Sequence, residues 1–313
     1  MRIFRHYDAL PEEVRGASVA VGNFDGVHRG HQAVIGEAGR HAQASGVPWA
    51  VLTFEPHPRN VFQPGGPPYR LTPFRVKAHH VGALGVDAMI TLHFDKEFSL
   101  RSAEDFVQDV LLDGIGVSHV VCGYDFVFGH GRKGNSEMLL QRGIEAGFGF
   151  TSLPAVRDGQ GEIFSSTRVR DLLAAGDPLG AAHVLGRHFE VDGRVEEGAK
   201  LGRTIGFPTA NLPLGEYAHP KRGVYAIRAG IDEGDNTVWV DGVANVGTRP
   251  TVDGTGVLLE AHLFDFDADL YGRNLRVALH GFIRPEKKFD GLDALKAQIT
   301  EDCGTARRIL AQP

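Results

Sequence analysis

Residues 17–31 read ASVAVGNFDGVHRGH, a short apolar run followed by a turn punctuated with glycine. The run from Ala17 to Val21 predicts a strand that ends at Gly22, and the stretch from His31 to Ala44 predicts a helix. A strand that leads through such a turn into a helix is typical of α/β folds, in which ligands bind at the carboxyl ends of parallel strands. This stretch therefore indicates a fold class and a place for a ligand.

The same alternation extends outward from this stretch. Apolar runs at 49–54, 88–94 and 117–122 predict further strands, and residues 103–112 predict another helix. We expect a Rossmann-like α/β domain over residues 1–186. Past Gly186 the chain changes to short apolar runs separated by glycine turns, which predicts a small antiparallel β-barrel or sandwich over residues 187–313 with a C-terminal helix.

Composition narrows the possible partners. The chain has 313 residues, a formal net charge of -6 and two cysteines. A mildly acidic chain is a poor general binder of nucleic acid, because phosphate backbones demand a basic surface. Two distant cysteines argue against a disulfide scaffold, and no apolar run reaches the length of a signal peptide or a membrane span. We expect a cytoplasmic protein that acts on small molecules.

The turn from Gly22 to His31 has the features of a phosphate site. Its glycines allow the backbone to approach a ligand, and the helix start offers free N–H groups and a positive dipole end. His28 and His31 are three residues apart, so on a helical turn they share a face and could stabilise charge on a phosphate. A helix start with two solvated histidines is the alternative, and the strand before the turn favours the phosphate site.

Three further segments could form part of the same site. Residues 165–168, SSTR, open another predicted helix, as simple caps or as groups that grip an anionic leaving group. The other two segments are TFEPHP at 53–58 and GYDFVFG at 123–129. The first could be simply a rigid proline-rich loop and the second a buried aromatic turn. Alternatively, both could line an aromatic crevice that suits a flat ring.

The second half lacks the GxxxxGK[ST] pattern of P-loop kinases, but it contains PTAN at 208–211. Thr209 and Asn211 are two residues apart and face the same way on an extended chain. Their oxygens are hard ligands that suit Mg²⁺, although the segment could also be a proline turn that enters a strand. Glu260 lies in an apolar run as a candidate base, or as an outward glutamate in normal alternation.

These motifs carry a family resemblance. HRGH together with SSTR resembles the adenylyl-transferring nucleotidyltransferases. With GNFDGVHRGH and the two loops, the first half looks like that of bacterial bifunctional riboflavin kinase/FAD synthetases, although Tyr124 stands where an acidic residue is expected. The second half resembles riboflavin kinase through GRTIGFPTAN at 202–211, GVY at 223–225, ANVGTRPT at 244–251, EAH at 260–262 and IRPEKKF at 283–289.

The resemblance implies a role for each matching residue. The adenylyltransferase ATP would contact Gly22, Phe24, Asp25, His28, His31, Ser165, Ser166, Thr167 and Arg168. Its flavin would contact Phe54, Pro56 and Asp125. The kinase ATP would contact Gly198, Lys200, Gly202, Phe207, Thr209 and Asn211. Thr209 and Asn211 would hold Mg²⁺, Glu260 would be the base of the kinase, and His28 and His31 would be the catalytic residues of the adenylyltransferase.

The expected activity is therefore a pair of ATP-dependent reactions. Riboflavin is phosphorylated to FMN, and FMN is adenylylated to FAD with release of pyrophosphate. Two alternatives remain at this point: an adenylyltransferase for another phosphorylated small molecule, and a flavin-binding regulator without catalysis on an inherited fold.

Overall fold

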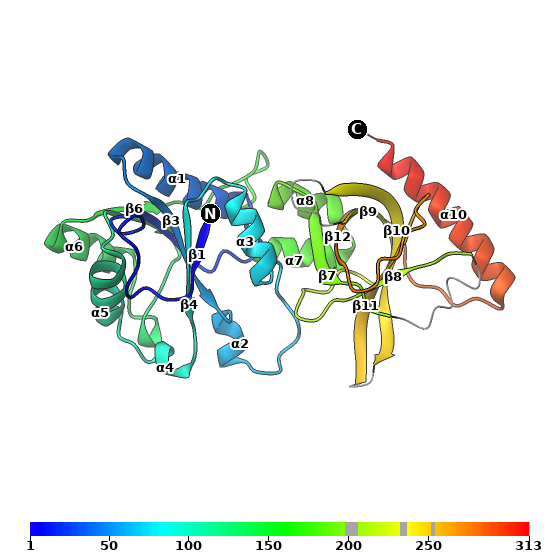
Figure 1. The fold of residues 1–313 in the computed structure, drawn as a ribbon, viewed down its shortest axis with the longest axis horizontal. Helices are drawn as coiled ribbons and strands as arrows, with labels where there is room; N and C mark the ends of the chain where they lie inside the picture. Colours follow the sequence, from blue (N-terminus) through cyan, green and yellow to red (C-terminus); the bar gives the residue numbers. More distant parts are fainter. Residues whose placement is uncertain (198–205, 232–236, 252–253, 313) are drawn as a thin grey trace. The chain divides into compact units, whose positions relative to one another are not determined.

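The computed structural model describes residues 1–197, 206–231, 237–251 and 254–312. The chain forms two compact units (Figure 1), one of residues 1–67 with 72–165 and the other of residues 68–71 with 166–313. Two helices, α7 (Ser166–Ala175) and α8 (Pro178–Leu185), belong to the second unit by their contacts. The expected division at residue 186 would place both helices with the first half of the chain.

The first unit is built on a six-stranded parallel sheet in the order β1-β4-β3-β2-β5-β6. The strands are β1 (Arg2–Phe4), β2 (Ser18–Val21), β3 (Trp49–Glu55), β4 (Ala88–His93), β5 (His119–Gly123) and β6 (Gly149–Leu153). The chain runs from β2 to β3 on one side and resumes at β5 on the other. The strand order therefore reverses between β2 and β5, and open α/β sheets bind ligands at the carboxyl end of such a switch point.

Helices cover both faces of this sheet (Figure 1). Helices α1 (Arg29–Ser45) and α3 (Phe74–Gly82) bury one face through Ile35 and Val81. A π-type helix, η1 (Phe106–Ile115), and α6 (Ser136–Ala146) bury the other. Short helices follow the strand ends: α2 (Pro58–Phe62), α4 (Lys96–Ser99), α5 (Ala103–Asp105) and the 3₁₀ turn η2 (His130–Arg132). Burial on both faces explains why β2 to β5 are continuous apolar runs.

The second unit contains a six-stranded antiparallel sheet in the order β7-β12-β9-β10-β11-β8. The strands are β7 (Phe189–Arg194), β8 (Ala210–Pro213), β9 (Gly223–Ile231), β10 (Val238–Thr251), β11 (Gly254–Leu263) and β12 (Asn274–Arg284). The backbone N–H of Glu196 donates to the carbonyl of Asn211 at 2.9 Å, so the end that follows β7 meets β8 and nearly closes the barrel.

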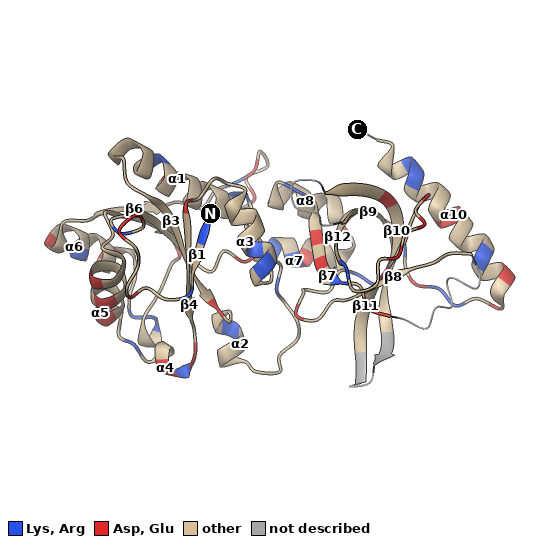
Figure 2. Ribbon diagram, viewed as in Figure 1, with Lys and Arg blue, Asp and Glu red and all other residues tan. Residues whose placement is uncertain are grey.

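Helix α10 (Leu292–Leu310) covers one outer face of this barrel. Ala306 and Leu310 of the helix pack against Val224, Val243 and Phe264 of the strands. The parallel α/β domain, the antiparallel barrel and the C-terminal helix confirm the predicted fold class. Figure 2 shows that acidic and basic residues are interspersed along both units. Within the described residues, no helix has both the length and the hydropathy needed to cross a membrane.

Candidate active sites

The turn after β2 places the two predicted catalytic histidines together at the switch point. His28 caps α1, and its Nδ1 accepts a hydrogen bond from the backbone N–H of His31 at 3.3 Å. The two rings stack with centroids 3.6 Å apart. The predicted shared face is therefore confirmed. Because Nδ1 of His28 accepts, the proton of its neutral ring resides on Nε2.

Phe24 and Asp25 support this turn from inside the fold. Phe24 is buried with a positive φ of 48°, and its ring lies against Gly22, where an added Cβ would come within 3.0 Å of it. The Asp25 carboxylate is 3% exposed and accepts from the backbone N–H of Thr72 at 3.0 Å. Gly26 N–H in turn donates to the Thr72 hydroxyl at 2.8 Å. These contacts fix the backbone of the turn, and direct contact of either side chain with ATP stays a prediction.

The predicted flavin residue Phe54 belongs to an aromatic cluster at the ends of β3 and β4. Its ring centroid lies 5.9 Å from Phe94, 6.2 Å from Phe98 and 6.3 Å from Phe106. Phe106 extends the cluster to Phe128 at 5.3 Å, in the loop after β5. Phe98 and Phe106 were not predicted from the sequence. Phe94 ends the strand predicted over residues 88–94, at a strand end where a ligand loop was expected.

The other two predicted flavin residues lie in the neighbouring loops. Pro56 directly follows β3 through a cis peptide bond with Glu55. Asp125 is exposed in the loop after β5, and its Oδ1 would lie 3.1 Å from a Cβ placed on Gly123. Tyr124, the departure from the family pattern, is 54% exposed. The loops after β3 and β5 thus project from the carboxyl end of the sheet, where the crevice was expected.

A buried ion pair holds the strand end that leads into Pro56. The Lys77 ammonium of α3 is 0% exposed and donates to the Glu55 carboxylate at 2.9 Å and to the Thr53 hydroxyl at 3.3 Å. A buried ammonium is tolerated only when it is paired and hydrogen-bonded. The pair thus ties α3 to the loop that would line the flavin site. Sequence reasoning missed it, because Lys77 lies in a helix without a motif.

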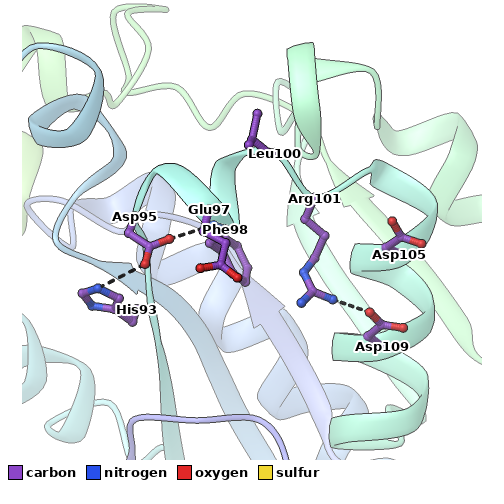
Figure 3. A pocket seen from close by; sticks show the side chains of 8 residues that line it. All are labelled: His93, Asp95, Glu97, Phe98, Leu100, Arg101, Asp105 and Asp109. Atoms are coloured by element: carbon purple, nitrogen blue, oxygen red, sulfur yellow. Dashed lines mark hydrogen bonds and ion pairs between the residues drawn. The ribbon is translucent and has the colours of Figure 1, made fainter.

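A cavity of about 500 Å³ opens beside the aromatic cluster (Figure 3). It is lined by His93, Asp95, Glu97, Phe98, Leu100, Arg101, Asp105 and Asp109. Its guanidinium, Arg101, is paired with Asp109, and Asp95 accepts from the N–H of Phe98 at 2.7 Å. The carboxylates outnumber the basic groups, so this cavity would repel a triphosphate and is a poor candidate for an ATP site.

The SSTR segment starts a helix, as predicted. Ser166 is the first residue of α7, so Thr167 and Arg168 stand in its first turn, and Ser165 precedes the helix. Arg170, one turn further, donates from Nε to the carbonyl of Tyr69 at 2.7 Å. The contact of these residues with ATP stays a prediction.

In the second unit, the predicted kinase residues form a row across three strands. Glu260 on β11 is the register partner of Asn211 on β8 and of Asn245 on β10. Register partners point to the same face, with Cβ atoms about 4.5–5.5 Å apart. Asn211 is 5% exposed, and Glu260 and Asn245 are half-buried. The sequence predicts no separate role for Asn245, which is part of the motif at 244–251. The pairing of β10 with β11 places it beside Glu260.

The face that carries this row is the one that α10 covers in part. Val243, two residues before Asn245 on β10, packs against the helix. Arg284 of β12 donates to the buried Asp302 of α10 at 2.7 Å, so this guanidinium anchors the helix to the barrel. The Glu286 carboxylate reaches over Gly247, where a Cβ would lie 2.2 Å from Oε1, so a larger residue there would displace this side chain.

The remaining kinase predictions divide into two groups. Phe207 and Thr209 lie just before β8, and the Phe207 ring meets His262 edge-on with centroids 5.4 Å apart. Gly198, Lys200 and Gly202 lie outside the described residues. The hydroxyl of Thr209 and the amide oxygen of Asn211 are hard donors of the kind that Mg²⁺ prefers, and their binding of Mg²⁺ stays a prediction.

Comparison with known proteins matches both units. The family model for FAD synthetase matches residues 10–168, and the one for riboflavin kinase matches residues 185–310. The bifunctional riboflavin kinase/FMN adenylyltransferase of Escherichia coli K12 is 43% identical over 308 residues, which cover 98% of this chain and 96% of that protein. The protein of the same name from Pseudomonas fluorescens is 43% identical over 312 residues, covering 99% of this chain and 98% of that one.

A solved structure has the same fold. The crystal structure described as a macrolide-efflux protein from Streptococcus pneumoniae superposes with a TM-score of 0.84 at 29% sequence identity, covering 98% of this chain and 99% of that one. Two family models together match most of the chain, and the relatives align along nearly all of it. This chain therefore belongs to the family of bifunctional riboflavin kinase/FMN adenylyltransferases.

Proposed function

We propose that this chain makes FAD from riboflavin in two ATP-dependent steps, phosphorylation to FMN on the antiparallel barrel and adenylylation of FMN at the turn that follows β2 of the parallel sheet. The observation that carries the proposal is the similarity to the Escherichia coli enzyme, which runs through both units at 43% identity. An adenylyltransferase for another substrate would have no use for the second unit. A regulator without catalysis would have no need of the row formed by Asn211, Glu260 and Asn245.

In the kinase step, the Glu260 carboxylate accepts the proton of the terminal ribityl hydroxyl as that oxygen attacks the γ-phosphorus of ATP. ADP leaves with the electrons of the broken P–O bond. Thr209 and Asn211 would hold Mg²⁺, which neutralises phosphate charge when it is bound. Glu260 stands between Asn211 and Asn245 on paired strands, so its carboxylate is held in place before the substrate arrives.

The nucleotide of the kinase step needs further contacts. Gly198, Lys200 and Gly202 would bring a glycine-rich segment to its phosphates. Phe207, half-buried before β8, offers a ring face or edge to the nucleotide.

In the adenylyltransferase step, a phosphate oxygen of FMN attacks the α-phosphorus of a second ATP, and pyrophosphate leaves. FMN is itself the nucleophile, so no covalent enzyme intermediate is required. His28 and His31, at the start of α1, would stabilise charge on the pentavalent phosphorus together with the free N–H groups of the helix. Residues Ser165 to Arg168 would bind the departing pyrophosphate.

The flavin ring of FMN would lie against Phe54 and Pro56, with Asp125 at its polar edge. The aromatic cluster beneath Phe54 supports this placement, because stacked and edge-on rings form a rigid apolar wall for a flat ligand. The phosphate of FMN then points toward the turn after β2, which follows the adjacent strand of the sheet.

The test is chromatography of riboflavin, ATP and Mg²⁺ incubated with the purified protein. We expect FMN to rise first and FAD to follow, with one ADP and one pyrophosphate formed for each FAD. Accumulation of FMN without FAD would contradict the assignment of the first unit. Flavin that binds without consumption of ATP would contradict both assignments and favour the regulator.

A further inference from the structure

His262 lies beside two parts of the kinase site, the segment that carries Thr209 and the strand that carries Glu260. The proposed mechanism gives it no role. It follows Glu260 by two residues on β11, so both side chains are on the same face of the strand. One ring nitrogen, Nδ1, lies 2.9 Å from the carbonyl oxygen of Pro208. The ring also meets Phe207 edge-on at 5.4 Å. His262 therefore contacts the segment that carries Thr209 from the strand that carries Glu260.

The contact of His262 with Pro208 lies just beyond the end of the hydrogen-bonded pairing between β8 and β11. In the register of β8 and β11, Asn211 pairs with Glu260 and Ala210 with Ala261, and β8 begins at Ala210. Thr209 is thus the first residue beyond the ladder. The bond from His262 to the Pro208 carbonyl attaches the chain to β11 on the far side of Thr209. Pro208 has no N–H, so its carbonyl is the only backbone group through which this residue can be hydrogen-bonded.

Resting on the proposed kinase function, we propose that His262 is a positioning residue, whose hydrogen bond to Pro208 fixes the Thr209 hydroxyl relative to the Glu260 carboxylate. A carbonyl can only accept, so Nδ1 is the donor and carries a proton in the neutral ring.

Two variants separate this bond from simple packing. In His262→Asn, the side-chain amide can occupy the place of Nδ1 and donate to Pro208. In His262→Gln, the amide occupies the place of Nε2, which points away from that carbonyl. Both variants lose the ring contact with Phe207. Only the hydrogen bond distinguishes them, so each is the matched control of the other.

Riboflavin phosphorylation by the full chain is the first measurement. We expect His262→Gln and His262→Ala to lose about 10- to 100-fold in kcat/KM for Mg-ATP, since small displacements of positioned groups cost this much. His262→Asn should stay within about threefold of wild type and keep the wild-type pH profile, because a single neutral hydrogen bond is preserved. Calorimetric binding of Mg-ADP, independent of turnover, should weaken in His262→Gln and not in His262→Asn.

Two controls belong to the same experiment. FMN adenylylation should be unchanged in all three variants, and thermal unfolding should show that the second unit remains folded. Equal kinase rates and equal Mg-ADP affinity in folded His262→Asn and His262→Gln would overturn the proposal and leave His262 as a packing residue. A wild-type chain that forms no FMN would instead contradict the proposed function, so the two failures are distinguishable.

Discussion

The two units of this chain present their candidate residues in different ways. In the first unit they stand in turns that follow parallel strands, and neighbours such as Phe24 and Asp25 are buried supports of the turn. In the second unit they stand on antiparallel strands, in the row formed by Asn211, Glu260 and Asn245. Glu260 and Asn245 of the row are half-buried, so a substitution of either should change chemistry with little effect on folding. Substitutions around the turn should often change both.

The largest effect should come from Glu260→Gln. This change keeps the size of the side chain and removes the proton acceptor, so we expect riboflavin phosphorylation to fall by about 10²–10⁴-fold, the usual share of a general base. FMN supplied directly should still become FAD at the wild-type rate. The measurement is the initial rate of each step with its own flavin substrate. An unchanged kinase rate would remove Glu260 from the mechanism.

The next effect tests the turn of the first unit. His31→Ala removes the ring stacked on His28, and we expect FMN adenylylation to fall on the order of 10²–10³-fold, the range for loss of one preorganised charge-stabilising group. FMN formation from riboflavin is the internal control and should be unchanged. If both steps fell together, the division of labour between the units would be wrong.

A third change tests how much the buried ion pair of Lys77 and Glu55 contributes to the stability of the first unit. Lys77→Met leaves the Glu55 carboxylate without its ammonium, and breaking a buried pair costs about 3–5 kcal/mol of unfolding free energy. Urea unfolding should show this loss in the first unit alone. The double variant Lys77→Met/Glu55→Gln should recover part of it, since no uncompensated charge remains. Equal losses in the single and double variants would show that packing, rather than charge, is responsible.

The smallest effect is a loss of stability at acid pH, which we expect to be similar in the two units. Each contains a close histidine pair: His41 stacks on His119 with centroids 3.7 Å apart, and His188 lies tilted against His280, also at 3.7 Å. Burial, together with a smaller effect of the neighbouring imidazole, lowers the pKa of His119 to about 4 and that of His280 to about 4. Both rings are therefore neutral in the folded chain at pH values where the unfolded chain takes up protons.

Stability from both pairs is thus fully present above the unfolded pKa of about 6.5 and is lost as the pH falls toward 4. We expect urea midpoints of both units to fall between pH 7 and pH 5. His119→Gln, which can keep the bond to Thr151, should flatten this dependence in the first unit only, and His280→Phe in the second only. A pH dependence that neither variant changes would assign it to other groups.

Much of the fold could be predicted because the strands of the first unit are continuous apolar runs between glycines. The run from Ala17 to Val21 is a clear example. β1 was missed because its three residues, Arg2 to Phe4, form no apolar run, and they join the sheet only by pairing with β4. In the second unit, apolar runs bounded by glycine turns predicted β7, β9, β10, β11 and β12, whereas β8 was not predicted as a strand.

The sites were less accessible to sequence reasoning, because they depend on distant partners. The burial of Asp25 depends on Thr72, which is 47 residues away. The interaction of His262 with Pro208 spans 54 residues. Motif spacing predicted that His28 and His31 lie side by side, although His28 is the extended N-cap residue of α1 and only His31 lies in the helix. Which strand lies beside Glu260 is a property of the folded sheet.

Because Glu260 and Asn211 are register partners, the kinase geometry depends on how side chains alternate between the two faces along β8 and β11. Successive residues of a strand face opposite sides, so one residue added within β8 or β11 would exchange every inward and outward side chain beyond it. The Glu260 carboxylate and the Asn211 amide would then lie on opposite faces of the sheet. Such an insertion could leave a folded barrel that transfers no phosphate. Changes in chain length within this unit are therefore tolerable in its turns and harmful in these two strands.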